Sequence, residues 1–253
     1  MSDRIPPSTP ETPREPVRVQ MPDNKPVVTI AIIIITVIFF ALQYLAQSLT
    51  GTDILFIYGG KINQFIMMGQ LWRLLTPALL HGSILHIAVN MYALYIIGSR
   101  LERFYGPGRF FLLYVLSAFA GNVLSFVLTP APSLGASTAI FGVFAAEGMF
   151  IFQNRKLFGE MRTRQAMINL GVILMINLGF GFMPGTNIDN MGHIGGLLGG
   201  VFFAWKAGPE LKLTGQPPFF SVKDGRRKAD ILIASMVVMV GFVVIALIPF
   251  LSA

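Results

Sequence analysis

The segment 27–46 reads VVTIAIIIITVIFFALQYLA, twenty consecutive residues without a charged side chain. A helix needs about 20 mostly apolar residues to cross the hydrocarbon core of a bilayer. The segment 231–250, ILIASMVVMVGFVVIALIPF, has the same character. These two stretches predict a chain that crosses a membrane at both of these places.

The composition of the whole chain supports the same interpretation. Of its 253 residues, 54% are hydrophobic and 12% are charged, whereas a soluble domain carries about 25% charged residues. These proportions exclude an ordinary soluble enzyme, a disordered chain and, despite the formal net charge of +7, a nucleic-acid-binding protein. The chain has no cysteine, which excludes disulfide scaffolds, cysteine metal sites and thiol catalysis.

Five more spans are predicted between the two clearest ones, which gives an all-α polytopic membrane protein with seven helices. Several of them are short and contain Gly, His or Asn, which favours contact with other helices over contact with lipid. The predicted spans are 27–46, 78–99, 109–129, 137–153, 167–183, 190–205 and 231–250.

Lysine and arginine are distributed unevenly over the loops of this arrangement. Seventeen of the nineteen lie in the N-terminal tail or beside the ends of the second, fourth and sixth spans, and the exceptions are Lys61 and Arg73 in the first loop. Because basic loops stay in the cytoplasm, we predict a cytoplasmic N-terminus and an extracytoplasmic C-terminus. A tail without targeting features suits a multi-pass protein of a bacterial plasma membrane.

Four segments follow from this pattern. Residues 1–26 hold seven of the sixteen prolines and both signs of charge, so we expect a disordered cytoplasmic tail. Residues 27–205 are expected to form a six-helix core, and 230–253 a seventh transmembrane helix. Residues 206–229 are expected to be a basic cytoplasmic linker that lies against the anionic headgroups of the bilayer.

The second, fourth and sixth spans all run inward from the outer face, so their first polar residues share one depth. These residues are His81, His86 and Asn90, then Ser137, then His193. Polar side chains in membrane helices turn toward the bundle interior or toward water. The three spans therefore predict one aqueous site that opens outward.

Ser137 begins the fourth span, where the first backbone amides of a helix lack intrahelical partners and the helix dipole is positive. Gly135 and Ala136 before it leave room for a substrate backbone, and the Ser137 amide can donate to an oxyanion. The simpler interpretation is a serine that caps the helix or packs against a neighbour.

His193 is the candidate base. It lies among glycines at four-residue spacing, Gly192, Gly196 and Gly200, which allow close packing against the small residues of the fourth span. Such packing would bring His193 within hydrogen-bond distance of Ser137, and a serine with a histidine is the minimal pair for acyl transfer. The alternative is a histidine that only joins two helices by a hydrogen bond.

His86 and Asn90 are four residues apart and therefore lie on one helix face. Both can donate a hydrogen bond to a developing oxyanion, and both can equally be interhelical hydrogen-bonding residues. His81 lies at the mouth of the second span. Asp189, four residues before His193, is either a third catalytic residue that orients the imidazole or an acid favoured at a helix start.

A zinc site built from His81, His86 and His193 is a competing hypothesis, since three histidines can hold catalytic zinc. The sequence disfavours it, because His81 and His86 are five residues apart and no H-E-x-x-H pair exists. No metal and no other cofactor is expected.

In order and spacing, these motifs resemble the rhomboid family of intramembrane serine proteases over about residues 60–205. The residues that carry the resemblance are Trp72-Arg73, His81 with His86 and Asn90, Glu102 with Gly106 and Gly108, Gly135-Ala136-Ser137-Thr138, and Asn190-Met191-Gly192-His193-Ile194-Gly195-Gly196.

The resemblance implies a six-helix rhomboid bundle with one added C-terminal helix. It implies a serine endopeptidase with a Ser137–His193 dyad, and an oxyanion hole from His86, Asn90 and the Ser137 amide. The implied substrates are single-span membrane proteins, cut within or beside their transmembrane segments.

The resemblance also implies supporting residues. Phe141 matches an aromatic position that packs against the catalytic histidine, and Trp72 and Arg73 belong to a structural loop that dips into the membrane. The remaining supporting residues are Gly135, Asn190 and Glu102.

Two residues depart from the expected pattern. Thr138 stands where the family often has glycine. Glu147 lies deep in the fourth span, where an ionised carboxylate is costly.

Two other functional classes stay open at this stage. Inactive rhomboid relatives bind membrane proteins without cleaving them, although this chain keeps both Ser137 and His193. A transporter predicts polar residues through the full depth of the bundle, and only Glu147 fits that pattern. The sequence does not determine the natural substrate or the oligomeric state.

Overall fold

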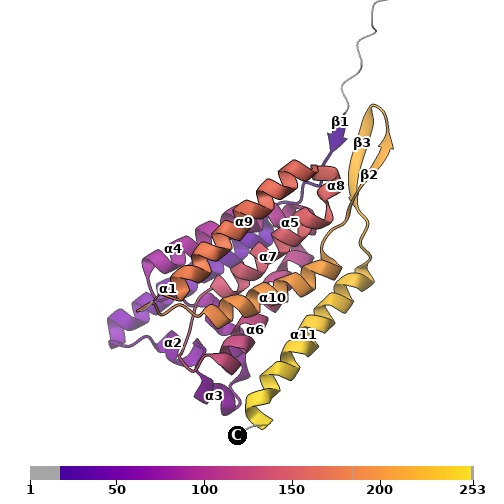
Figure 1. The fold of residues 1–253 in the computed structure, drawn as a ribbon. Coiled ribbons are helices and arrows are strands. Elements are labelled where there is room, and N and C mark those ends of the chain that lie inside the picture. The colour runs from indigo at the N-terminus through magenta and orange to yellow at the C-terminus, as the bar shows by residue number, and fades with distance from the viewer. Residues whose placement is uncertain (1–17, 184, 252–253) are drawn as a thin grey trace, which may run out of the picture.

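The computed structural model describes residues 18–183 and 185–251, and there the chain is a bundle of long helices with a small sheet at one end (Figure 1). In chain order the elements are β1 (Arg18–Gln20), α1 (Val27–Thr50), α2 (Ile54–Gly59), α3 (Asn63–Met67), η1 (Leu71–Leu74), η2 (Thr76–Leu79), α4 (Ile84–Ala93), η3 (Leu94–Gly98), α5 (Ser99–Tyr105), α6 (Pro107–Leu128), α7 (Ser137–Gln153), α8 (Arg155–Phe158), α9 (Glu160–Gly181), α10 (Asn190–Ala207), β2 (Leu211–Gln216), β3 (Phe219–Asp224) and α11 (Lys228–Leu251).

The helical membrane architecture expected from the sequence is confirmed. A helix lies at each of the seven predicted spans, and four helical segments of the described chain are long and apolar enough to cross a membrane. These four are α1, the continuous stretch Ile84–Tyr105, α6 and α11, while α7 is a shorter apolar helix. The number of seven crossings stays a prediction.

The second span was predicted at 78–99, and this placement is wrong at both ends. Residues 76–79 form a short 3-10 turn that contains Pro77, and the helix begins only after Ser83, whose hydroxyl accepts from the His86 amide at 3.1 Å. The helix then continues through a π-helical turn to Tyr105. It stops at Gly106, whose φ of 72° lies in the left-handed region, because a residue without Cβ adopts that conformation at little cost.

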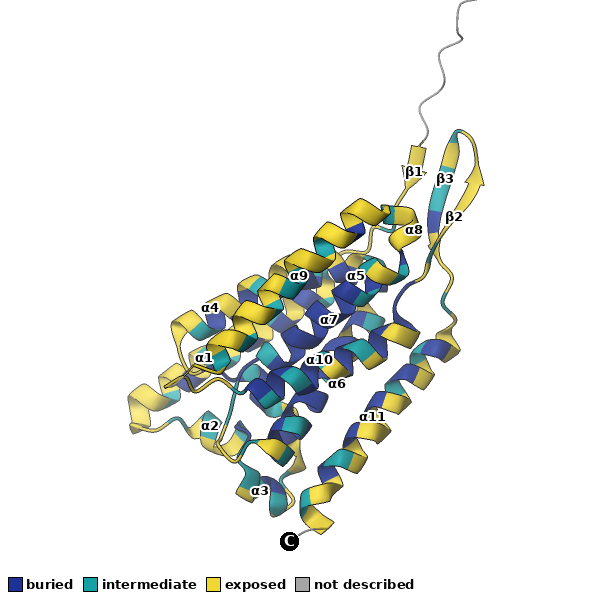
Figure 2. Cartoon of the chain, viewed as in Figure 1, coloured by how far each residue is buried: buried dark blue, intermediate teal, exposed yellow. Residues whose placement is uncertain are grey.

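The buried residues concentrate in α6, α7 and α10 at the centre of the bundle, whereas α1, α9 and α11 have exposed outer faces (Figure 2). These outer faces are apolar and include exposed Ile34, Val172 and Val240. Water disfavours an apolar surface of this extent, so the exposure fits helices surrounded by lipid.

Glu102 caps the N-terminal end of α1, although it lies on α5. Its carboxylate is fully buried and accepts from the amides of Val28 and Thr29 at 2.9 and 2.8 Å and from the Thr29 hydroxyl at 2.7 Å. The first amides of a helix have no intrahelical partner, and the positive end of the helix dipole favours a carboxylate. Glu102 therefore fixes the start of the first helix to α5.

Arg73, one of the two basic residues of the predicted outer side, is buried inside the first loop. Its guanidinium donates to the carbonyls of Gly60 at 2.7 Å and Ile57 at 2.6 Å, and its Nε donates to the Gln70 side chain at 2.8 Å. Two of these bonds satisfy carbonyls at the end of α2. Arg73 therefore holds the loop together and does not act as a surface charge.

The tail and the linker contain a three-stranded sheet, where the sequence predicted no ordered structure. Strands β2 and β3 form an antiparallel hairpin, and β1 pairs with β3 in parallel, with Arg18 opposite Phe219. The tail prediction is therefore wrong for residues 18–20, and the rest of it up to residue 17 lies outside the described residues. The pairing of β1 with β3 joins strands about 200 residues apart, and no local composition reveals such hydrogen bonds.

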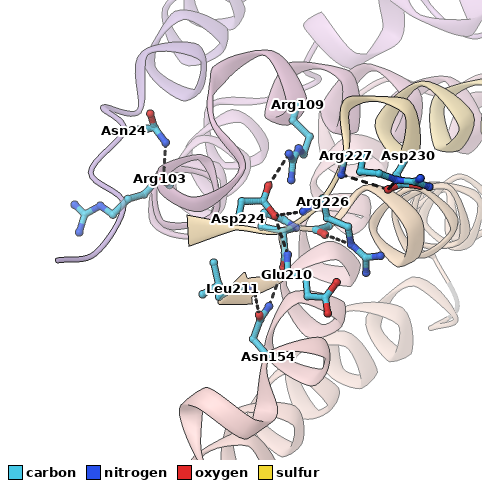
Figure 3. A network of polar contacts seen from close by, with 12 residues as sticks. Asn24, Arg103, Arg109, Asn154, Glu210, Leu211, Asp224, Arg226, Arg227 and Asp230 are labelled. Atoms are coloured by element: carbon cyan, nitrogen blue, oxygen red, sulfur yellow. Dashed lines mark hydrogen bonds and ion pairs between the residues drawn. The ribbon is translucent and has the colours of Figure 1, made fainter. Parts of the chain in front are cut away.

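Polar contacts tie the hairpin to the helices (Figure 3). Arg109 in the first turn of α6 forms an ion pair with Asp224 of β3 at 2.7 Å. The Asn154 side chain after α7 donates to the carbonyl of Pro209 at 2.9 Å and accepts from the amide of Leu211 at 2.7 Å. The linker is therefore a folded element anchored at two helix ends.

The carboxylate of Glu102 generates a prediction about stability. Glu102→Ala leaves the buried amide and hydroxyl of Thr29 and the part-buried amide of Val28 without their acceptor, so we expect the free energy of unfolding in detergent micelles to fall by about 2–4 kcal/mol. Glu160→Ala is the matched control, because Glu160 is an exposed carboxylate in the first turn of α9. That variant should lose less than about 1 kcal/mol, and equal losses would contradict the role of the buried contacts.

Candidate active site

Ser137 and His193 meet at the N-terminal ends of α7 and α10. The Oγ atom of Ser137 lies 2.9 Å from Nε2 of His193. Ser137 is the first residue of α7 and Ala136 before it is the N-cap residue, so Ser137 does not occupy the position that the capping alternative requires. The hydroxyl is directed to the imidazole instead, which is the arrangement of a nucleophile with its base.

Glycines allow the two helices to approach closely enough for this contact. A Cβ atom on Gly196 would lie 1.9 Å from the carbonyl oxygen of Thr138, and one on Gly200 would lie 2.2 Å from that of Gly142. No side chain fits at these distances. The glycine spacing seen in the sequence therefore has the packing role expected of small residues in membrane helices.

Phe141, one turn after the serine, stacks on the imidazole of His193. The ring centroids are 4.1 Å apart and the planes differ by 8°. The Nδ1 atom of His193 is buried and has no hydrogen-bond partner among the described residues. The ring orientation therefore depends on Phe141 and on the contact with Ser137.

Asp189 is not the residue that orients this imidazole. One carboxylate oxygen accepts from the Gly192 amide at 2.9 Å and lies 3.5 Å from the Thr129 hydroxyl, and the other accepts from the Ser125 hydroxyl. Asp189 is thus the N-cap of α10, as the simpler alternative predicted. It fixes the start of the helix that carries His193.

His86 faces the serine across Gly135. A Cβ atom on Gly135 would lie 2.9 Å from Cε1 and Nε2 of His86 and 3.5 Å from the Ser137 hydroxyl. The Gly82 amide lies 3.5 Å from Nδ1 of His86 in donor geometry. A neutral imidazole has one donor and one acceptor nitrogen, so this contact leaves Nε2 of His86 as the donor beside the serine.

Asn90 lies one turn after His86 and is buried. Its Nδ2 atom has no hydrogen-bond partner within the part of the chain that the structure describes. A buried donor without an acceptor is costly, and an oxygen that develops negative charge nearby would satisfy it.

His81 lies in the segment before α4 and supports the neighbouring loop. Its Nε2 accepts from the Ala136 amide at 3.5 Å, its own amide donates to the Gln43 side chain at 3.0 Å, and its ring packs edge-on against His86 at 4.9 Å. Burial, with a smaller contribution from His86, lowers the pKa of His81 to about 3. The ring is therefore neutral at physiological pH.

The three-histidine zinc hypothesis has no matching geometry among the described residues, where no three His, Cys, Asp or Glu side chains are placed to hold a metal ion. The ring of His81 accepts a hydrogen bond from the Ala136 amide, and the ring of His193 contacts the Ser137 hydroxyl.

Other residues named from the sequence make contacts further from Ser137 and His193. Trp72, half-exposed, donates from its ring nitrogen to the Tyr58 carbonyl at 3.0 Å. Asn190 donates to the Leu178 carbonyl at 3.3 Å and so joins the start of α10 to α9. Glu147 forms an ion pair with Arg100 of α5, which compensates its charge inside the bundle.

Sequence reasoning missed two buried polar residues beside the site, Lys61, which donates to the carbonyls of Thr129 and Ala131, and Gln43. Gln43 is a buried amide on α1 that accepts from the His81 amide and donates to Asp53 at 2.8 Å. The available signal was a polar residue inside an otherwise apolar span. Lys61 had a clearer signal, since it is a basic residue on the side where basic residues are rare.

Comparison with known proteins gives the family of this chain. Residues 68–210, more than half of the chain, match the family model described as Rhomboid domain. The chain therefore belongs to the rhomboid family, and with its apolar helices it is a multi-pass membrane protein.

Three relatives illustrate the similarity. Rhomboid protease GluP of Bacillus subtilis is 45% identical over 182 residues, which cover 72% of this chain and 35% of that protein. Rhomboid-like protease 3 of Toxoplasma gondii is 42% identical over 137 residues, 52% of this chain and 50% of that protein. RHOMBOID-like protein 4 of Arabidopsis thaliana is 36% identical over 148 residues, which cover 58% of this chain and 36% of that protein. The chain spans between about a third and a half of the length of these relatives.

The close approach of α7 and α10 generates a prediction. Gly196→Ala drives the helices apart, because the new methyl group collides with the Thr138 carbonyl, and the free energy of unfolding should fall by about 1–3 kcal/mol or more. In Gly171→Ala the methyl group meets no atom within 4 Å, so the better helix propensity should raise stability by up to about 1 kcal/mol. Unfolding in detergent micelles measures both, and a similar loss in both variants would refute the packing argument.

Proposed function

We propose that this chain is an intramembrane serine endopeptidase that cleaves membrane proteins within or beside their transmembrane segments. The observation that carries the proposal is the 2.9 Å contact between Ser137 Oγ and His193 Nε2. Membership of the rhomboid family and similarity to a relative named as a protease support it.

In the proposed reaction, the Ser137 hydroxyl attacks the scissile carbonyl carbon while Nε2 of His193 takes the hydroxyl proton. His193 then gives that proton to the leaving amine. A water molecule repeats the sequence on the acyl-enzyme, with His193 again as the base, and releases the second product. Stacking on Phe141 keeps the imidazole in the plane that both transfers need.

Three donors are proposed to hold the oxyanion of the tetrahedral intermediate. The backbone amide of Ser137 belongs to the first turn of α7, where amides lack intrahelical acceptors. Nε2 of His86 lies beside Gly135, and the unpaired Nδ2 of Asn90 is one turn further along α4. Such donors stabilise charge that exists only in the transition state, which lowers the barrier.

The proposed topology has a cytoplasmic N-terminus and an extracytoplasmic C-terminus, with the dyad open to water at the outer face. The small sheet lies at one end of the bundle and α3 with the C-terminal end of α11 at the other (Figure 1), which is compatible with this topology. Substrates are proposed to be single-span proteins whose helix must unwind before attack, so residues of weak helix propensity near the scissile bond should favour cleavage.

Removing the nucleophile or the base tests the proposal. Purified chain in detergent should cleave a labelled single-span substrate, and Ser137→Ala and His193→Ala should each reduce the rate by about 10³-fold or more. Ser235→Ala is the matched control on α11, where the hydroxyl donates to the Ile231 carbonyl of its own helix, and its rate should stay unchanged.

A fluorophosphonate probe gives a second readout, because it should label Ser137 in the unsubstituted chain and in the control but not in Ser137→Ala. If the unsubstituted chain binds the substrate tightly without cleaving it and resists the probe, the chain is an inactive binding protein and the protease proposal is wrong.

Metal dependence is tested separately. The dyad needs no metal ion, so treatment with EDTA should leave the cleavage rate unchanged. A loss of activity that added Zn²⁺ restores would contradict the dyad and favour the three-histidine site.

A further inference from the structure

Lys61 is a lysine without solvent exposure in the first loop. Its ammonium group donates to the carbonyl oxygens of Thr129 and Ala131, both at 2.7 Å. Burial lowers its pKa to about 8, while the nearby Asp189 carboxylate acts in the opposite direction. At neutral pH the group is therefore mostly charged, and burying a charge is costly unless its contacts compensate it.

The two carbonyls lie where α6 ends and the loop 129–136 leads to Ser137. The negative end of the α6 dipole favours a cation at this place. Lys61 also pairs with the loop through its backbone, since its amide donates to the Ser133 carbonyl at 2.9 Å and the Ser133 amide donates back at 3.0 Å. Side chain and backbone together fix the loop at two successive points on the way to the serine.

The same end of α6 holds the start of α10. Asp189, the N-cap of α10, contacts the hydroxyls of Ser125 and Thr129. Thr129 therefore offers its carbonyl to Lys61 and its hydroxyl to Asp189. Through this residue, the loop that leads to Ser137 and the helix that carries His193 share one anchor.

We propose that Lys61 is a positioning residue for the dyad, which sets the place of Ser137 relative to His193 by anchoring the end of α6 and the loop 129–136 to the first loop. The inference rests on the proposed function and deepens it. It also explains why a lysine lies on the predicted outer side, where the chain otherwise has almost no basic residue.

Lys61→Met tests the inference, because methionine keeps the length and apolar volume of the side chain but cannot donate to the two carbonyls. Per folded molecule, the rate of fluorophosphonate labelling of Ser137 and kcat for substrate cleavage should both fall by about 10- to 100-fold, with KM little changed. Amide hydrogen exchange in residues 129–136 should become faster, while exchange in α6 and α11 stays the same.

Arg109→Met is the matched control. Arg109 is also a largely buried cation beside an end of α6, but it lies at the opposite end and pairs with Asp224. This variant should keep the labelling rate and kcat of the unsubstituted chain. A residue with a merely structural role would lower the melting temperature and leave the labelling rate per folded molecule unchanged.

Each outcome decides a separate question. If the unsubstituted chain neither cleaves nor labels, the proposed function fails, whereas the hydrogen-exchange comparison still tests the anchor. If the unsubstituted chain labels and Lys61→Met labels at the same rate, the positioning inference is overturned. Lys61→Gln is the second variant, and failure of both variants to fold would make Lys61 a folding residue and would also overturn the inference.

Discussion

The backbone contact between α7 and α10 is the constraint on which the candidate site depends. Helices in a bilayer gain little from the hydrophobic effect when they associate, so their packing relies on dispersion forces and close approach. Here Gly196 touches the Thr138 carbonyl and Gly200 touches Gly142. This approach brings the first residue of α7 within reach of a histidine on α10. A chemical pair from distant parts of the sequence thus exists because α10 has glycines where it crosses the backbone of α7.

The parts of the fold that lipid dictates were predictable from the sequence. An apolar helix must be long enough to cross the bilayer, so α1 and α11 were located to within a few residues at their starts. The second span was misplaced by six residues at its start, because the turns around Pro77 are nearly as apolar as the helix after Ser83. Hydropathy cannot distinguish a buried loop from a span, whereas a capping serine can.

The candidate residues were identified by their type and depth, and Ser137 was paired with His193, but the partners of the acidic residues were not identified. Asp189 had two possible roles, and only the contacts with Gly192 and Ser125 distinguish them. Glu147 had no partner within its own span, because Arg100 lies on a different helix. The contacts of Asp189 with Ser125 and of Glu147 with Arg100 join residues far apart in the chain, and a single sequence carries no signal for such contacts.

The parallel pairing of β1 with β3 has a mechanical consequence. β1 precedes the first long helix by a few residues, and β3 precedes the last one by a few residues. The short segments that join β1 to α1 and β3 to α11 are therefore linked to each other through the sheet. A displacement of α11 along the membrane normal would break hydrogen bonds between β1 and β3 and would pull on the end of α1 that Glu102 holds. We therefore expect the two lipid-facing helices to move along the membrane normal together.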